Sequence, residues 1–403
     1  MLLQTLGCGL GVVYMSYVRL IPSMEDYAQR FRQLDALDFK IIKSMYEHGF
    51  SNVSKIAELI GAPKQTVSYH SRKLDQQDLV RFRALIDEAK LGLKSFMVLA
   101  SAAPGKESVS SRALTCFPLW RYLAIVDGWK HGSYLRYVIP HDKERDLDAF
   151  LAEVKRRDLI SDFEVFATTS PNYPLLNLEF YGQKEGFPVF DWDKWMSDLD
   201  RFPEEELCES ASYERTKIDL YDLIILRCLE INARTNQRKI VNEMMRILKN
   251  KEASRFVPLV SRRIRDLVNN KGLVRGYRAY LFPNPVPTAI LLMYHMVFSN
   301  TSNLRRFLTG LGYLPYNTGY EKVLNRDELF VRLIVPAHEC SNVWRSMSKL
   351  AEKGYLKDVH LFLGDLAHKT WDNVEIYQMF KGETWNFSYG IAAEMLDKTL
   401  SQK

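Results

Sequence analysis

The sequence predicts an α+β protein with two winged helix-turn-helix domains, each followed by a ferredoxin-like sandwich. Three observations point to this fold class. Much of the second half of the chain matches the first half at a shift of 196 residues. Each copy opens with three short amphipathic helices, and each continues with elements in the order β-α-β-β-α-β. With 403 residues, 47% of them hydrophobic, the chain has enough apolar material for several cores.

The internal repeat is clearest in the sandwich regions. Residues 134–186 align with residues 330–382 without a gap, so that Tyr134-Leu-Arg-Tyr-Val-Ile-Pro140 meets Phe330-Val-Arg-Leu-Ile-Val-Pro336. Further upstream, Val67-Ser68 aligns with Val260-Ser261 at a shift of 193. Few residues are identical, but apolar positions coincide throughout. Similarity at one long period indicates that a whole structural unit is repeated.

These observations divide the chain into six segments. Residues 191–214 hold nine acidic and two basic side chains, which suggests a join between the halves. Residues 1–18 carry no charged side chain but are shorter and richer in glycine than an ordinary membrane span. Met24 is the favoured start of the folded protein, and a packed or loose extension or a membrane anchor are the alternatives. The expected segments are an extension at 1–33, a winged helix at 34–88, a sandwich with an appendage at 89–200, an acidic linker at 201–217, a second winged helix at 218–282 and a second sandwich with an appendage at 283–403.

The first winged helix is predicted from helical spacing of apolar residues over 34–45, with Asp35 as the N-cap of its first helix. A second helix covers 53–60, and the Gly61-Ala62-Pro63 turn leads into a third at 64–76. On this third helix the spacing turns Val67, Ser71 and Leu74 inward and Lys64, Gln65, Ser68, Tyr69 and Arg72 outward. The alternating stretch 79–83 is expected to form a wing, with Arg81 and Arg83 pointing outward.

The second winged helix repeats this plan with more positive charge. Residues 238–278 hold twelve Lys or Arg and three Asp or Glu. Helices are expected at 218–229 and 237–248, followed by a third helix and a wing that begins near Arg275. In the third helix Val257, Val260, Ile264 and Leu267 should face inward, and Ser261, Arg262 and Arg265 outward.

An exposed helix with hydrogen-bonding and basic side chains suits the major groove of DNA. Ser, Gln, Tyr and Arg can bond base edges, while flanking Arg and Lys hold the phosphates by charge. Winged helices that bind proteins would present a similar surface, so that reading stays open. The candidate DNA-binding residues are Lys64, Gln65, Thr66, Ser68, Tyr69, Arg72, Arg81 and Arg83 in the first head, and Arg255, Ser261, Arg262, Arg265, Arg275 and Arg278 in the second.

Each sandwich is predicted from alternating apolar strands and two amphipathic helices. In the first, strands are expected at 95–100, 119–126, 133–139 and 163–167, with helices at 107–117 and 143–157. The second should have strands at 289–298, 321–324, 329–335 and 359–363, with helices at 302–311 and 340–352. The aromatic appendages at 190–195 and 385–389 are interpreted as packing anchors.

The Leu34-Asp35-Ala-Leu-Asp38 opening, the Thr66-Val67-Ser68 helix and the sandwich that follows resemble the Lrp/AsnC family of transcriptional regulators. The resemblance covers about 34–167 and, more faintly, 218–363. It implies that sandwiches pair, here as a pseudo-dimer within one chain or as a homo-oligomer, and that a small-molecule effector can bind between them. The family's Gly-x-x-Asp turn is not intact at Gly128 or at Asn325, which argues against an amino acid as that effector.

An enzyme is not expected. No phosphate-binding glycine loop follows a predicted strand, and no nucleophile motif or metal-spaced His/Cys set occurs, so neither cofactor nor metal is predicted. The five cysteines are scattered, which favours a reducing, cytoplasmic compartment. The sequence therefore predicts a DNA-binding transcriptional regulator without a membrane partner. The alternative is a sequence-independent, chromatin-like DNA binder or a winged-helix adaptor between proteins.

Overall fold

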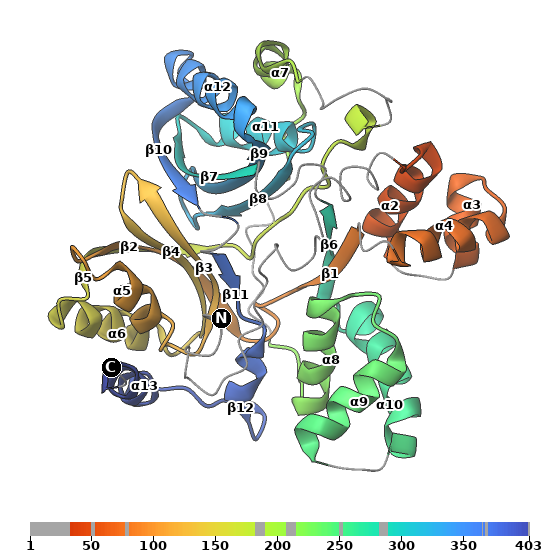
Figure 1. The fold of residues 1–403 in the computed structure, drawn as a ribbon, viewed down its shortest axis with the longest axis horizontal. Helices are drawn as coiled ribbons and strands as arrows, with labels where there is room; N and C mark the ends of the chain where they lie inside the picture. Colours follow the sequence, from red (N-terminus) through yellow and green to blue (C-terminus); the bar gives the residue numbers. More distant parts are fainter. Residues whose placement is uncertain are drawn as a thin grey trace.

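A computed structural model describes residues 33–49, 53–76, 80–181, 190–206, 215–249, 253–281, 289–364, 366 and 370–401. The predicted N-terminal extension, except for its last residue, and the centre of the acidic linker lie outside these residues. Within them, no helix combines the length and the apolar character that a membrane crossing requires. The two helical heads lie on one side of the molecule and the two sheets on the other, with a two-stranded ribbon between them (Figure 1).

Each head is a three-helix unit, as predicted. The first contains α2 (Ala36–His48), α3 (Val53–Ile60) and α4 (Lys64–Gln76). The second contains α8 (Leu220–Ile231), α9 (Gln237–Leu248) and α10 (Ala253–Arg265), which continues into the π-helical turn η4 (Asp266–Asn270). The inward positions of α4 are buried as expected, and so are Val260 and Leu267 in the second head. The prediction that Val257 faces inward was wrong, because this residue is 47% exposed. It lies near the start of α10, where its side chain does not pack on the core of the head.

The strands that leave the heads form one ribbon instead of two separate wings. Strand β1 (Val80–Ile86) pairs antiparallel with β6 (Val274–Leu281), and Arg83 stands opposite Arg278. The expectation of an independent wing in each head was therefore wrong. An isolated strand leaves its backbone N–H and C=O groups without partners, and here the strand of the other half supplies them.

Both sandwiches show the predicted order of elements. The first comprises β2 (Leu93–Ala102), α5 (Glu107–Leu114), β3 (Trp120–Gly128), β4 (Gly132–Pro140), α6 (Glu144–Arg156) and β5 (Ile160–Thr168). The second comprises β7 (Ala289–Phe298), α11 (Thr301–Leu311), β8 (Asn317–Lys322), β9 (Glu328–Pro336), α12 (Cys340–Glu352) and β10 (Leu356–Gly364). Their strands run β5-β2-β4-β3 and β10-β7-β9-β8, so the strand order is the same in both halves.

The two sheets join edge to edge into one curved sheet. Strand β10 pairs with β3 over three residues, Phe362–Gly364 against Val126–Gly128. At the far edges, β5 and β8 approach each other through a bridge between Thr168 and Val323. Helices cover the outer faces (Figure 1). The inner faces meet through aromatic contacts such as Tyr134 with Phe330, whose ring centroids lie 5.8 Å apart.

The appendages cross between the halves. After the first sandwich come the turn η2 (Leu178–Tyr181), α7 (Trp192–Asp198) and η3 (Leu199–Arg201), and α7 packs on α12 of the second sandwich. Trp195 Nε1 donates to the carbonyl of Gly310, 2.9 Å away. After the second sandwich come β11 (Thr370–Asp372), which pairs with β3, then η7 (Glu375–Met379), the short hairpin of β12 (Phe380–Lys381) and β13 (Thr384–Trp385), and α13 (Tyr389–Ser401), which packs on α5 and α6.

The aromatic appendages are thus anchors, but each anchors on the sandwich of the other half. Trp385 Nε1 donates to the carbonyl of Leu91, and the rings of Phe387 and Phe117 lie 4.4 Å apart. Because the appendage of each half packs on the sandwich of the other half, the two sandwiches cannot separate without breaking both contacts.

Candidate nucleic-acid interface

A buried carboxylate holds the third helix of the first head in place. Asp35 caps α2 and, with Asp38, completes a reciprocal capping box. Asp38 is fully buried, and its two oxygens contact His70 Nδ1 at 2.7 Å and Lys73 Nζ at 3.0 Å, both from α4. Asp35, Asp38 and His70 bring three potential ligand atoms within 4.8 Å of one another. Since Lys73 already supplies a cation there, we interpret the group as an ion-pair anchor for α4.

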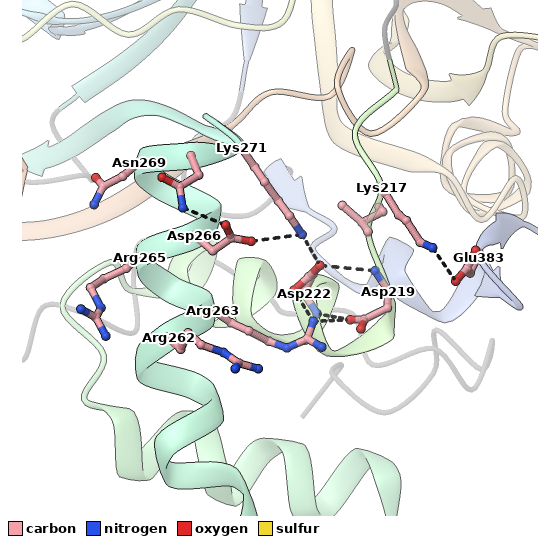
Figure 2. A pocket seen from close by; sticks show the side chains of 12 residues that line it. Lys217, Asp219, Asp222, Arg262, Arg263, Arg265, Asp266, Asn269, Lys271 and Glu383 are labelled. Carbon is pink, nitrogen blue, oxygen red and sulfur yellow. Dashed lines mark hydrogen bonds and ion pairs between the residues drawn. The ribbon is translucent and has the colours of Figure 1, made fainter.

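The second head repeats this anchor with different cations. Asp219 and Asp222 form the capping box of α8, and Asp222 is buried. Its oxygens accept from Arg263 at 2.6 Å and Lys271 at 2.9 Å (Figure 2). Burial would lower the pKa of Arg263, but the hydrogen bonds to Asp219 and Asp222 outweigh it and raise that pKa. In both heads the same capping motif therefore fixes the third helix against the first.

The outer face of α4 carries the side chains that the spacing assigned to it. Lys64, Gln65, Tyr69 and Arg72 are exposed, and Thr66 and Ser68 are half-buried. Tyr69 has 62% of its surface exposed, so its ring is available for contact with a partner. Arg72 Nε donates to the carbonyl of Ser68, a weak contact at 3.3 Å that leaves its guanidinium at the surface.

The outer face of α10 is more strongly basic. Arg262 and Arg265 are exposed, and within the described residues neither has a hydrogen-bond or ion-pair partner, while Ser261 is half-buried. Arg265 points away from the Asp222 anchor, on the other side of the helix (Figure 2). A groove of about 850 Å³ runs between this helix and the segment before α8. The side chain of Arg255 lies outside the described part of the structure.

Four other candidate arginines lie on the ribbon, and three of them make contacts within the protein. Arg83 is 7% exposed and bonds Asp372 at 2.9 Å, so its predicted outward direction was wrong. The guanidinium carbon of Arg278 lies 3.7 Å from the ring centroid of Tyr173 and 3.9 Å from that of Tyr280. Arg275 is exposed but bonds Asn172 at 2.6 Å, beside the first sandwich. Arg81 is half-buried on β1. The alternation of residues along a strand predicts that the strand has two faces. It does not predict which of these faces the other half of the molecule covers.

The sequence reasoning missed a buried charged cluster beneath the ribbon. Glu88 accepts from Arg136 at 2.6 Å and from Arg121 at 3.2 Å, and all three are buried. Burial would raise the pKa of Glu88, but the charges of Arg136 and Arg121 outweigh it and hold that pKa below its usual value. One signal was available: Arg136 and Arg332 interrupt otherwise apolar strands at equivalent places in the two halves.

Comparisons with known families and proteins support the first head. Residues 34–81 match the model of a winged helix-turn-helix DNA-binding family. An uncharacterised HTH-type transcriptional regulator of Pyrococcus horikoshii is 29% identical over 141 residues, which cover 34% of this chain and 87% of that protein. Another, from Pyrococcus furiosus, is 29% identical over 122 residues, covering 30% of this chain and 80% of that protein.

A similar fold over nearly the whole chain occurs in a crystal structure of the siroheme decarboxylase NirDL. It has a TM-score of 0.51 and 12% identity, and the match covers 90% of this chain and 98% of that one. At this identity the likeness concerns the fold alone. An AsnC-family transcriptional regulator from Agrobacterium tumefaciens is 20% identical, with a TM-score of 0.28 over 40% of this chain and 99% of that one.

Proposed function

We propose that this protein is a DNA-binding transcriptional regulator of the Lrp/AsnC type. The observation that carries the proposal is the outer face of α4, where Lys64, Gln65, Tyr69 and Arg72 stand exposed within a domain that matches a winged helix-turn-helix DNA-binding family. These side chains would enter the major groove, with Tyr69 and Arg72 at base edges or phosphates.

The second head would contribute mainly charge. Arg262 and Arg265 have no acidic partner within the described residues, so they are available to phosphates. The capping anchors of both heads are the same, which supports the view that both third helices are recognition helices. The ribbon joins the heads in one chain, as the two subunits of a dimer would be joined. We therefore propose an intramolecular pseudo-dimer with two unequal heads.

The test is a titration of the full chain against genomic fragments, including its own promoter, at two salt concentrations. Tight binding of a few fragments that survives the higher salt is expected. The Tyr69→Ala/Arg72→Ala variant should lose that preference. Arg326→Ala serves as the control, because Arg326 is exposed in the turn between β8 and β9 of the second sandwich and belongs to neither head.

Two other outcomes would overturn the proposal in different ways. Uniform binding that collapses at higher salt would favour a sequence-independent, chromatin-like protein. Absence of DNA binding at both salt concentrations would favour an adaptor whose heads contact proteins. The salt dependence separates these alternatives because base contacts discriminate between fragments, whereas phosphate contacts do not.

A further inference from the structure

A cavity of about 60 Å³ lies under the β1/β6 ribbon, at the point where both heads connect to the sheets. Five arginines from both halves line it: Arg83, Arg121, Arg136, Arg275 and Arg278. Three carboxylates, Glu88, Glu230 and Asp372, line it with them. The lining therefore has an excess of two positive charges. Removing charged groups from water costs several kcal/mol for each ion unless an opposite charge compensates it.

The carboxylates are shared among the arginines. Glu88 serves both Arg121 and Arg136, and Arg121 also bonds Glu230. Burial lowers the pKa of Arg121 even with Glu88 and Asp372 close by. Arg275 itself bonds an amide oxygen and a backbone carbonyl, both uncharged. The lining of the cavity thus holds more arginines than carboxylates.

The equivalent position in the second half shows that this excess is specific to one place. Arg332 on β9 corresponds to Arg136 on β4, and it is paired with Glu321 on the adjacent strand β8. Glu321 stands opposite Phe330, whereas Ala124 stands opposite the corresponding Tyr134 in the first half. The second half therefore neutralises its arginine with its own neighbouring strand. The first half has no carboxylate at that position and leaves Arg136 to the shared Glu88.

The cavity adjoins a larger groove of about 490 Å³. The two share Leu85, Tyr173 and Arg275 in their linings. The groove is bounded by rings from three different parts of the molecule: Tyr46 of α2, Tyr277 of β6 and Tyr320 of β8. Two carboxylates also line it, Glu47 and Glu205, and Glu205 accepts a hydrogen bond from the Tyr320 hydroxyl at 2.9 Å. Such walls suit a flat or apolar body, while the arginines suit an oxyanion, since guanidinium groups bond carboxylate and phosphate with a fixed geometry.

We propose that this site binds a small organic anion, with its carboxylate or phosphate group among the arginines and its apolar body in the aromatic groove. The small cavity has room for one such oxyanion group, because a single water molecule needs only about 10–15 Å³ of such space. The ligand would touch the first head through Tyr46, the ribbon through Arg275 and the second sandwich through Tyr320. This inference rests on the proposed function: because the ligand would contact the first head, the ribbon and the second sandwich, its binding would change the position of the heads relative to the sheets and so act as an effector.

The first test measures binding to the full chain without DNA, by isothermal titration calorimetry. The probes are inorganic phosphate and phenyl phosphate, with phenol as the uncharged control. Saturable binding of both phosphates, tighter for phenyl phosphate, is expected. Arg275→Gln should weaken both by about tenfold or more, since it removes a charged donor. The control Arg326→Gln, which removes the same charge at an exposed site, should bind like the unmodified protein.

A second variant keeps every arginine and fills the groove. Gly276 lines the groove, and no heavy atom lies within 4 Å of the place where its Cβ would stand. Gly276→Leu is therefore expected to fold and to weaken phenyl phosphate by about tenfold, while inorganic phosphate binds as before. Lack of saturable binding by either phosphate, or equal binding by Arg275→Gln and Arg326→Gln, would overturn the proposal.

Coupling to DNA is measured separately, so that the two proposals can fail independently. If phosphates bind but the chain does not bind DNA, the site stands and the regulator function falls. If both occur, phenyl phosphate should shift the DNA affinity of the unmodified chain and leave that of Arg275→Gln unchanged. A ligand that binds without shifting the DNA affinity would overturn its role as an effector.

Discussion

The two heads contain the same kind of anchor, an aspartate of a capping box that binds the third helix, but they differ in the outer faces of their third helices. In both, the buried second aspartate of a capping box holds the third helix, Asp38 in the first head and Asp222 in the second. Asp38 faces an imidazole and an ammonium group, whereas Asp222 faces a guanidinium and an ammonium group. The outer face of α4 mixes polar, aromatic and basic side chains, and that of α10 carries arginines. The comparison teaches that the anchor maintains the head while the outer face is free to change.

The largest expected effect comes from removing the anchors. Asp222→Ala should reduce the local stability of the second head by about 3 kcal/mol, because Arg263 and Lys271 lose their buried partner. Asp38→Ala should cost the first head less, about 2 kcal/mol, because it removes one lysine ion pair and one imidazole contact, whereas Asp222 pairs with both an arginine and a lysine. Amide hydrogen exchange of α8–α10 and of α2–α4 measures each head separately. Equal losses would remove the proposed difference between the anchors.

The stability of the junction between the first head and the first sandwich should depend on pH. Glu88 lies just beyond β1, and its pKa is held below its ordinary value of 4.5 in the folded state. Its ionised form therefore contributes stability that is complete above about pH 4.5 and is lost as the pH falls through the lower, folded-state pKa.

Glu88→Gln should accordingly lower the free energy of unfolding by about 3 kcal/mol at pH 7, because it leaves Arg121 and Arg136 with an uncharged partner. The deficit should shrink as both proteins are acidified below pH 4.5. Calorimetric unfolding at several pH values measures it, with the exposed Glu394→Gln as control. A deficit that stays constant with pH would show that Glu88 is not the titrating group.

The outer faces should differ in what they contribute to DNA binding. Tyr69→Ala and Arg72→Ala in the first head should each reduce the discrimination between specific and random DNA by about 1–3 kcal/mol for each lost base contact. Arg262→Ala and Arg265→Ala in the second head should weaken specific and random DNA equally. Competition binding assays on both DNAs measure these effects. An equal loss on both DNAs from the first-head variants would contradict a role in reading bases.

The smallest expected effect is on the salt dependence. If Arg262 and Arg265 each contact one phosphate, the double substitution should reduce the slope of log affinity against log salt by about 1.8. The control is the double variant Arg326→Ala/Lys106→Ala, which removes two charges from the surfaces of the sandwiches. An unchanged slope in the head variant would assign these arginines to another partner.

Much of the local structure followed from the spacing of apolar residues. The α4 helix has the predicted bounds, its inward residues are buried, and its outward residues reach the surface. Both sandwiches have the predicted order of strands and helices. In the second head, the apolar pattern of α10 did not predict that Val257, near the start of this helix, is exposed. The outward directions of Lys64, Gln65, Tyr69 and Arg72 on α4 and of Arg262 and Arg265 on α10 were confirmed, and that of Arg83 on the ribbon was wrong, while their role in DNA binding stays a prediction.

By itself the sequence determined the elements and the faces within each helix, since these depend on neighbours three or four residues away. Only the tertiary structure decided which strands and arms meet. Arg83 and Arg278 face each other because β1 pairs with β6, almost two hundred residues distant, and that pairing turns them toward Tyr280. Trp195 packs on the opposite sandwich for a similar reason. Strand pairing and helix docking are contacts between distant segments, and residue spacing along one segment contains no information about the partner.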